Sequence, residues 1–288
     1  MKTLLIIQGE GRGHISQAIA YCDKYDIEVS KVIISDQREI PNEFLDKFNN
    51  VDIIKLTSLN FQYERGKVSL SKTIIYNIKI FPIYLKSLYR TYKEMKGMDF
   101  VLNFYEILSI VSIFRRVKKH SISNQYLIFH LLWEKEITLF FLLVYFWTYL
   151  TKFGSEIMIA PCFKYLPSYK DLQVTKPLIN KDVEKLRPNK GNRILVYLFD
   201  KNLIEKFVDQ IDPKEEYDLF IESTDYGFPP NVEVYDLSRK YFLNKLESCK
   251  KVICSGGFQL ISEAKYLNKE VEVIPLHYEQ RMNQLNLG

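Results

Sequence analysis

The chain has 288 residues, of which 47% are hydrophobic and 26% are charged. This composition excludes a disordered chain, and the length suits two domains of ordinary size. The net charge of +5 and the pI near 8.7 favour an anionic ligand or membrane surface and do not indicate a nucleic-acid partner. The cysteines lack the CxxC spacing of metal or redox sites, so we expect no bound metal and buried free thiols at Cys22, Cys162, Cys249 and Cys254.

The start of the chain lacks the pattern of a signal peptide, because its apolar run is short and ends in glycines and charges. The longest uncharged stretch is residues 137–150. It is shorter than the roughly 20 residues that a helix needs to span a bilayer. We therefore expect a cytoplasmic protein in which this stretch forms a buried or interfacial helix.

Short apolar runs alternate with longer mixed segments over residues 1–160. Such alternation predicts a parallel sheet covered by helices on both faces, which is an α/β domain. The predicted strands are Leu4–Gln8, Val29–Ile34, Val51–Leu56, Phe100–Asn103, Gln125–Phe129 and Ile157–Ala160. The predicted helices are Ile15–Tyr25, Ser71–Met95, Ile107–Lys118 and Trp133–Leu150.

Residues 161–190 are rich in Pro, Lys, Tyr and Asn, and we interpret them as a linker. A second alternation of strands and helices occupies residues 191–288. We therefore predict two Rossmann-like domains that face each other across a cleft. The predicted strands of the second domain are Arg193–Phe199, Tyr217–Glu222, Val232–Tyr235, Lys251–Cys254 and Glu270–Ile274, and its predicted helices include Leu203–Gln210, Tyr241–Ser248 and Phe258–Leu267.

The first predicted strand runs into a glycine-rich turn and then a helix. Alternating glycines let the backbone turn sharply and approach another molecule closely. The N-terminus of a helix suits an anion, and His14 adds a proton carrier there. A ligand-facing loop is therefore indicated, with candidate residues Gly11, Arg12, Gly13 and His14.

Two other interpretations of this turn stay open. It is not a Walker loop, and it departs from the dinucleotide fingerprint because its third glycine comes one residue early. Asp36 lies near the end of the second predicted strand, where that fingerprint has an acidic residue, but it does not fix the assignment. A dinucleotide site and a purely structural turn are the alternatives.

A similar turn follows the predicted strand Lys251–Cys254. Ser255, Gly256 and Gly257 lead into a helix, which is the geometry of a phosphate cradle. Glu263 falls near the start of that helix, where its carboxylate could accept hydrogen bonds from the vicinal hydroxyls of a sugar. The alternative is an acidic residue that complements the helix dipole.

A third polar cluster follows the last predicted strand. Glu279, Gln280 and Asn283 fall on neighbouring positions of one helix face. Such a cluster can bind the hydroxyls of a sugar. A solvated helix start explains it equally well.

Together these segments resemble the GT-B fold glycosyltransferases related to family 28, which include the bacterial lipid-linked N-acetylglucosaminyltransferase of cell-wall synthesis. The resemblance covers both domains and is carried by a Gln-Gly-x-Gly-x-Gly-His start and a Glu-Gln-x-x-Asn end. It implies an acceptor-side domain over 1–160 and a nucleotide-sugar domain over 191–288. The implied reaction moves a hexose or N-acetylhexosamine from a nucleotide sugar, expected to carry UDP, to an acceptor hydroxyl.

The resemblance also implies roles for the candidate residues. Ser255, Gly256 and Gly257 would cradle the donor diphosphate, Glu263 would hold the ribose, and the cluster with Glu279 and Gln280 would contact the donor sugar. The implied mechanism is inverting and uses neither a metal nor a cofactor, with the nucleotide sugar as donor substrate. Related enzymes close with a helix that crosses back onto the first domain, and we expect this closing helix to be missing here.

Histidines are the candidates for the base that deprotonates the acceptor. His14 is the better candidate. His130 follows the predicted strand Gln125–Phe129 and would lie in a cleft loop, with a satisfied structural histidine as its alternative.

Residues 71–96 carry lysines at heptad spacing with aromatic residues between them: Lys72, Lys79, Lys86 and Lys93. A basic, aromatic-rich helix suits an anionic membrane surface, so we expect peripheral attachment to the inner face of the membrane and a lipid-linked or glycan acceptor. The alternative is a solvated basic face of an ordinary helix.

Two other function classes remain. A UDP-sugar epimerase of the same fold needs acidic residues near the anomeric carbon that the sequence does not locate. A non-catalytic sugar-nucleotide-binding subunit would fit the abrupt end of the chain.

Overall fold

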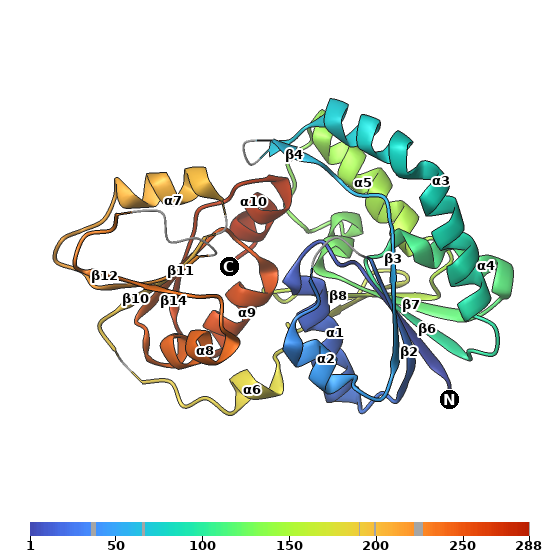
Figure 1. Cartoon of the computed structure of the whole chain (residues 1–288), viewed down its shortest axis with the longest axis horizontal. Helices are drawn as coiled ribbons and strands as arrows, with labels where there is room; N and C mark the ends of the chain where they lie inside the picture. Colours follow the sequence, from blue (N-terminus) through green and yellow to red (C-terminus); the bar gives the residue numbers. More distant parts are fainter. Residues whose placement is uncertain (36–38, 65–66, 190, 199, 222–226, 288) are drawn as a thin grey trace. The chain divides into compact units, whose positions relative to one another are not determined.

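The computed structural model describes residues 1–35, 39–64, 67–189, 191–198, 200–221 and 227–287 (Figure 1). The chain divides into two compact units. Unit 1 comprises residues 1–63 and 68–180, and unit 2 comprises residues 64–67 and 181–287. Each unit is built on its own parallel sheet, so the α/β class predicted for both halves is confirmed.

The sheet of unit 1 has seven parallel strands in the order β3-β2-β1-β6-β7-β8-β9. These strands are β1 (Thr3–Ile7), β2 (Val29–Ser35), β3 (Asp52–Leu56), β6 (Phe100–Phe104), β7 (Lys118–Ile122), β8 (Ile157–Pro161) and β9 (Leu172–Thr175). The short strands β4 (Tyr63–Glu64) and β5 (Lys67–Val68) pair with each other. The helices before residue 180 are α1 (Arg12–Tyr25), α2 (Asn42–Lys47), α3 (Leu70–Glu94), η1 (Ile107–Val111), α4 (Ser112–Arg115), η2 (Asn124–Phe129) and α5 (Leu139–Lys152), where η marks a 3-10 helix.

The central strand β1 shows how the sheet separates two cores. All of its residues are buried, so its sequence is continuously apolar from Leu4 to Ile7. Successive side chains point to opposite faces. Leu5 and Ile7 join the core with α1 and α2, while Leu4 and Ile6 join the core with α3, η1 and α5. Helices therefore cover both faces of this sheet, as Figure 1 also shows.

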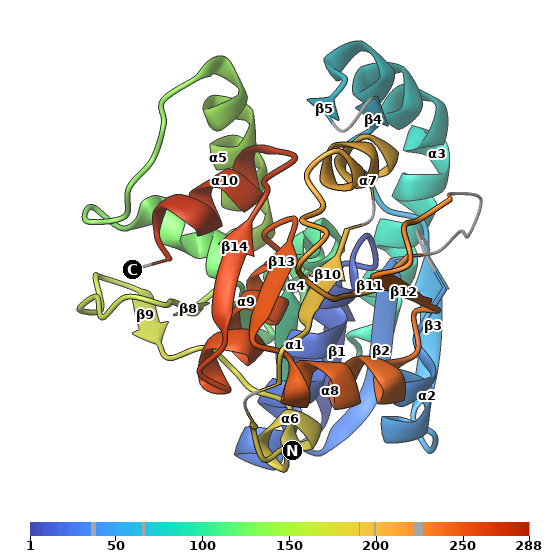
Figure 2. The same ribbon diagram turned by 90° about the vertical axis from the view of Figure 1, so that its left-hand side faces the viewer.

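The sheet of unit 2 has five parallel strands in the order β12-β11-β10-β13-β14, seen side by side in Figure 2. Val196 packs with Phe207 of α7 on one face, whereas the neighbouring ring of Tyr197 meets Phe242 of α8 on the other. The elements are β10 (Ile194–Tyr197), β11 (Tyr217–Phe220), β12 (Val232–Tyr235), β13 (Lys251–Cys254), β14 (Glu270–Val273), α6 (Lys181–Glu184), α7 (Lys201–Val208), α8 (Arg239–Ser248), α9 (Phe258–Tyr266) and α10 (Tyr278–Leu285).

Two predicted elements of unit 1 are wrong. The helix predicted over 107–118 is η1, α4 and the first residue of β7, and the strand predicted over 125–129 is the 3-10 helix η2. The apolar pattern did not predict strand β7, because the side chains that this strand buries include polar ones. The Lys119 ammonium donates to the Phe153 carbonyl at 2.6 Å, and the Ser121 hydroxyl meets the Ser155 hydroxyl at 2.7 Å.

Two other boundaries also differ from the prediction. Helix α5 begins at Leu139, because the Thr138 hydroxyl accepts a hydrogen bond from the Phe141 amide and caps the helix there. The segment 161–190, interpreted as a linker, contains β9, which pairs with β8, and the boundary between the units follows Asn180. The predicted strand ends at Phe199 and Glu222, as well as Asp36, lie outside the described residues.

The four cysteines are buried and form no disulfide, as predicted. Among the described residues, no helix is both long and apolar enough to cross a membrane.

Candidate active site

The glycine-rich turn of unit 1 joins β1 to α1. The Gly9 amide donates to the Ser35 hydroxyl at 2.6 Å, and a Cβ at Gly9 would lie 1.9 Å from the Ser35 carbonyl oxygen. By contrast, a Cβ at Gly11 or Gly13 would meet nothing within 4 Å. Gly11 is the N-cap of α1, and no side chain caps the helix or adds negative charge to its first turn. The amides that begin α1, next to the exposed Arg12, therefore suit an anion.

His14 lies in the first turn of α1 and stacks on Tyr105, with ring centroids 5.3 Å apart and an angle of 18° between the planes. The Tyr105 hydroxyl is fixed by Thr148 at 2.7 Å. Burial lowers the pKa of His14 to about 4, although the side chain of Gln17 acts in the opposite direction. The imidazole is therefore neutral at pH 7, which is the form that accepts a proton.

Glu106, which sequence reasoning missed, follows β6 at the same edge of the sheet as the glycine-rich turn. Its carboxylate is buried and accepts hydrogen bonds from the Ser58 hydroxyl and the Leu108 amide. The Glu106 amide donates to the Asn103 side chain at 3.0 Å. Burial raises the pKa of Glu106 to about 7 despite these hydrogen bonds. Its sequence signal was a single acidic residue after a buried strand.

His130 has the environment of a structural histidine. It is buried, its Nδ1 accepts from the Leu132 amide at 3.1 Å, and its Nε2 lies 2.8 Å from the Pro167 carbonyl oxygen. Since Nδ1 accepts, Nε2 carries the proton that it donates. The structure therefore favours the alternative of a satisfied structural histidine over a role in a cleft loop.

The second glycine-rich turn, in unit 2, joins β13 to α9. Gly256 has a φ of 99°, and a Cβ there would lie 2.8 Å from Val273 and 3.1 Å from Gln280. Gly257 is the N-cap of α9, and a Cβ there would meet nothing within 4 Å. Helix α9 has no side-chain cap and no acidic residue in its first turn. Its first amides, beside the buried Ser255, therefore suit an anion.

Glu263 lies in the second turn of α9 and not in the first, so it does not complement the helix dipole as the alternative suggested. Its buried carboxylate pairs with both terminal nitrogens of Arg239, at 3.1 and 3.2 Å. Gln259 also donates to it at 3.2 Å. Arg239 in turn bonds Asp182 at 3.0 Å, and these carboxylates raise the pKa of the guanidinium. Arg239 was not among the predicted site residues.

Helix α10 is tied to the second glycine-rich turn by its amide side chains. Asn283 donates to the Gly256 carbonyl at 2.9 Å, and the Gln280 carbonyl accepts from the Leu276 amide at 2.8 Å. Gln284 donates to the Val273 carbonyl at 2.9 Å. The predicted sugar-binding cluster is therefore brought next to Ser255–Gly257, with Gln280 and Asn283 bracing the turn and Glu279 in the first turn of α10.

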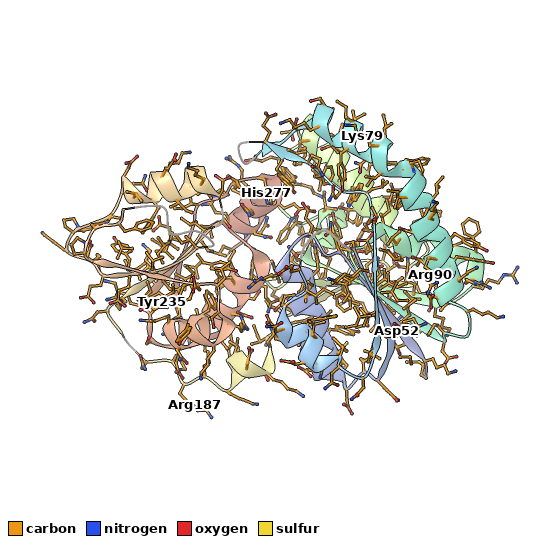
Figure 3. The ribbon with its side chains drawn as sticks, in the orientation of Figure 1. Asp52, Lys79, Arg90, Arg187, Tyr235 and His277 are labelled. Atoms are coloured by element: carbon orange, nitrogen blue, oxygen red, sulfur yellow. The ribbon has the colours of Figure 1, made fainter. Side chains whose placement is uncertain are left out.

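His277 is a further residue that the sequence reasoning passed over. It is the N-cap of α10 and is labelled in Figure 3. Burial lowers its pKa to about 4, so it too is neutral at pH 7. Its signal was its position directly before the polar cluster of α10.

A sequence model of the family described as Glycosyl transferase family 1 matches residues 1–288. No curated protein matches the chain in sequence. The resemblance to family 28 and to N-acetylglucosamine transfer therefore stays a prediction.

The structure is similar to solved glycosyltransferase structures at low sequence identity. UGT71G1 of Medicago truncatula, complexed with UDP-glucose, has a TM-score of 0.68 and 10% identity, covering 99% of this chain and 82% of that chain. UGT2 of Phytolacca americana, complexed with UDP-2fluoro-glucose and pterostilbene, has a TM-score of 0.64 and 12% identity, with the same coverage of both chains. A UDP-glucosyltransferase from Polygonum tinctorium has a TM-score of 0.64 and 11% identity, covering 99% of this chain and 82% of that chain. This likeness confirms the predicted GT-B fold.

The Arg239–Glu263 pair yields a prediction about stability. We expect Arg239→Ala to lower the free energy of unfolding by about 3 kcal/mol, because it removes the cationic partner of a buried carboxylate. Arg239→Lys should recover part of the loss. Urea unfolding measures the difference, with the exposed Arg187 as control: Arg187→Ala should change stability by about 0.5 kcal/mol or less. Equal losses of stability in Arg239→Ala and Arg187→Ala would contradict a stabilising role for the Arg239–Glu263 pair.

Glu106 yields a prediction about pH. Its pKa is raised from 4.5 to about 7 in the folded protein, so the unfolded chain ionises first as pH rises. Its contribution to stability is full below pH 4.5 and is lost as pH rises through 7, by up to about 3 kcal/mol. We measure the free energy of unfolding in urea at about pH 5 and about pH 8, and we expect Glu106→Gln to remove the loss of stability between the two pH values. The exposed Glu43→Gln should keep the wild-type difference, and an unchanged difference in Glu106→Gln would show the prediction to be wrong.

Proposed function

The chain belongs to glycosyl transferase family 1, whose model matches residues 1–288, and we propose that it moves a hexose or N-acetylhexosamine from a UDP-sugar to an acceptor hydroxyl. The observation that carries this proposal is the uncapped N-terminus of α9 beside a turn that only glycine fits. Several structural neighbours were solved with UDP or a UDP-sugar bound, which supports the same donor class here.

The donor diphosphate is proposed to bind at Ser255, Gly256 and Gly257. The first amides of α9 and the positive end of its dipole supply hydrogen bonds and favourable charge for this group. They stabilise the diphosphate both when bound and as the leaving group, which supports a reaction that needs no metal.

Glu263 is proposed to hold the ribose of the nucleotide. Its buried carboxylate lies on the helix that follows Ser255–Gly257, and a carboxylate is an acceptor for the vicinal hydroxyls of a ribose. Arg239 acts as a positioning residue that orients the carboxylate through two hydrogen bonds. Glu279 is proposed to contact the donor sugar, while Gln280 and Asn283 shape the turn beneath it.

The mechanism proposed for the transfer is a single inverting displacement. Neutral His14 takes the proton of the acceptor hydroxyl as that oxygen bonds to the anomeric carbon. The bond from the anomeric carbon to the diphosphate oxygen breaks in the same step, and the diphosphate leaves with the electron pair. Gly11, Arg12 and Gly13 form the acceptor-side loop around this base.

Donor binding tests the first half of the proposal. Gly257→Asp should keep α9 folded, because aspartate is a favoured N-cap and has room there. Its carboxylate should compete with the diphosphate and weaken UDP-sugar binding by at least about tenfold in calorimetry. Ser69→Asp makes a similar change at the uncapped start of α3 and should bind as the wild type does. No heat with any UDP-, GDP- or dTDP-sugar would refute both the transferase and the epimerase.

Turnover tests the second half. We expect His14→Ala to keep donor binding and to lower kcat by about a hundredfold or more, because general base catalysis contributes roughly 10²–10⁴. Release of the nucleotide in the presence of acceptor measures kcat. Wild-type turnover in His14→Ala would exclude this base, and conversion of the donor to a second nucleotide sugar would indicate the epimerase instead. Binding with no turnover in the wild type would indicate a non-catalytic subunit.

A further inference from the structure

Helix α3 exposes its apolar residues. Ile74, Ile78, Phe81, Leu85 and Tyr89 lie at helical spacing along one side, and all are exposed, with Ile78 reaching 69%. Isolated apolar residues on a surface are ordinary, but a row of five over four turns is not.

The side of α3 that faces the core is instead largely polar. Its buried residues are Thr73, Tyr84, Ser87 and Thr91, and the Thr91 hydroxyl donates to the Ser87 carbonyl within the helix. An ordinary surface helix buries its apolar side and exposes its polar side. The apolar row of α3 is therefore not explained by packing within unit 1.

Helix α5 has a second apolar row. Its buried residues include Val144, Thr148 and Thr151, while its exposed side carries Leu139, Leu142, Phe146, Tyr149 and, just past its end, Phe153. Tyr84 of α3 and Trp147 of α5 belong to the same core cluster, so both helices cover the same face of the sheet. Their exposed sides together form what we call the α3–α5 face.

Basic residues accompany the apolar row on α3. Lys79, Lys86, Arg90 and Lys93 lie on its exposed side, and Figure 3 shows Lys79 and Arg90 projecting from this helix. The only acidic residue within α3 is Glu94, which pairs with Lys31 and Arg90. The charge of this face is therefore positive. In a symmetric dimer through this face two positively charged faces would meet, which disfavours a second copy as the occupant.

We propose that the α3–α5 face binds the surface of an anionic lipid bilayer, with both helices lying in the interfacial plane. The apolar rows would enter the boundary between headgroups and acyl chains, and the basic side chains would contact lipid phosphates. This inference goes beyond the proposed glycosyl transfer and does not depend on it. If both hold, the acceptor-side unit would rest where a lipid-linked acceptor is found.

Sedimentation with vesicles tests the proposal without any sugar donor. The wild-type chain should bind vesicles of phosphatidylglycerol and phosphatidylcholine more tightly than vesicles of phosphatidylcholine alone. Raising the ionic strength from about 0.1 M to about 1 M should weaken the binding, since it shortens the Debye length from about 10 Å to about 3 Å. The double variant Ile78→Ser with Lys79→Glu should lower the partition coefficient for anionic vesicles at least about tenfold.

Two further double variants complete the design. Leu142→Ser with Phe146→Ser removes apolar contact from α5 alone and should also weaken binding. Lys240→Glu with Tyr241→Ser makes the matched change at neighbouring exposed positions of α8 and should bind as the wild type does. Circular dichroism checks that each variant is folded. Lack of wild-type binding to anionic vesicles, or equal binding by all folded variants, would overturn the proposal, as would a dimer that Ile78→Ser dissociates.

Discussion

Close packing around two glycines, Gly9 and Gly256, constrains the turns on which both candidate sites depend. At Gly9 the chain passes so near to Ser35 that a Cβ would lie 1.9 Å from its carbonyl oxygen, and at Gly256 a Cβ would lie 2.8 Å from the Val273 side chain and 3.1 Å from Gln280. The helices after these turns have the N-cap residues Gly11 and Gly257, which have no side chain to offer, so their N-termini are uncapped.

Each unit also buries titratable side chains, and the partners that offset the cost of burying their charge differ from one side chain to the next. Glu106 is surrounded by neutral donors, so burial raises its pKa to about 7. Glu263 is met by a guanidinium that bridges it to Asp182. Lys119 donates to two neutral acceptors, the Ser109 hydroxyl and the Phe153 carbonyl, and burial lowers its pKa to about 7. Of these three groups, Glu263 is the one paired with a cationic side chain.

The sequence predicted the elements whose apolar pattern matches their burial. β12 and β13 lie at the predicted residues, and both glycine-rich turns lie at the ends of buried strands as expected. The prediction failed where the buried residues are polar. Strand β7 was not predicted because it buries Lys119 and Ser121, and a strand was predicted instead at the apolar run 125–129, which is a 3-10 helix. Partners such as Arg239 could not be predicted, because its contact with Glu263 joins two helices through the fold and leaves no local pattern.

The strand order of unit 1 also bears on how the chain folds during synthesis. β1 lies between β2 and β6, so one of its two edges has no partner until residues 100–104 have left the ribosome. Until then a continuously apolar strand presents free amides and carbonyls, which are a template for pairing with other chains. Pairing over such a long sequence separation is also slow. Until β6 has been synthesised, β1 is therefore exposed to pairing with other chains.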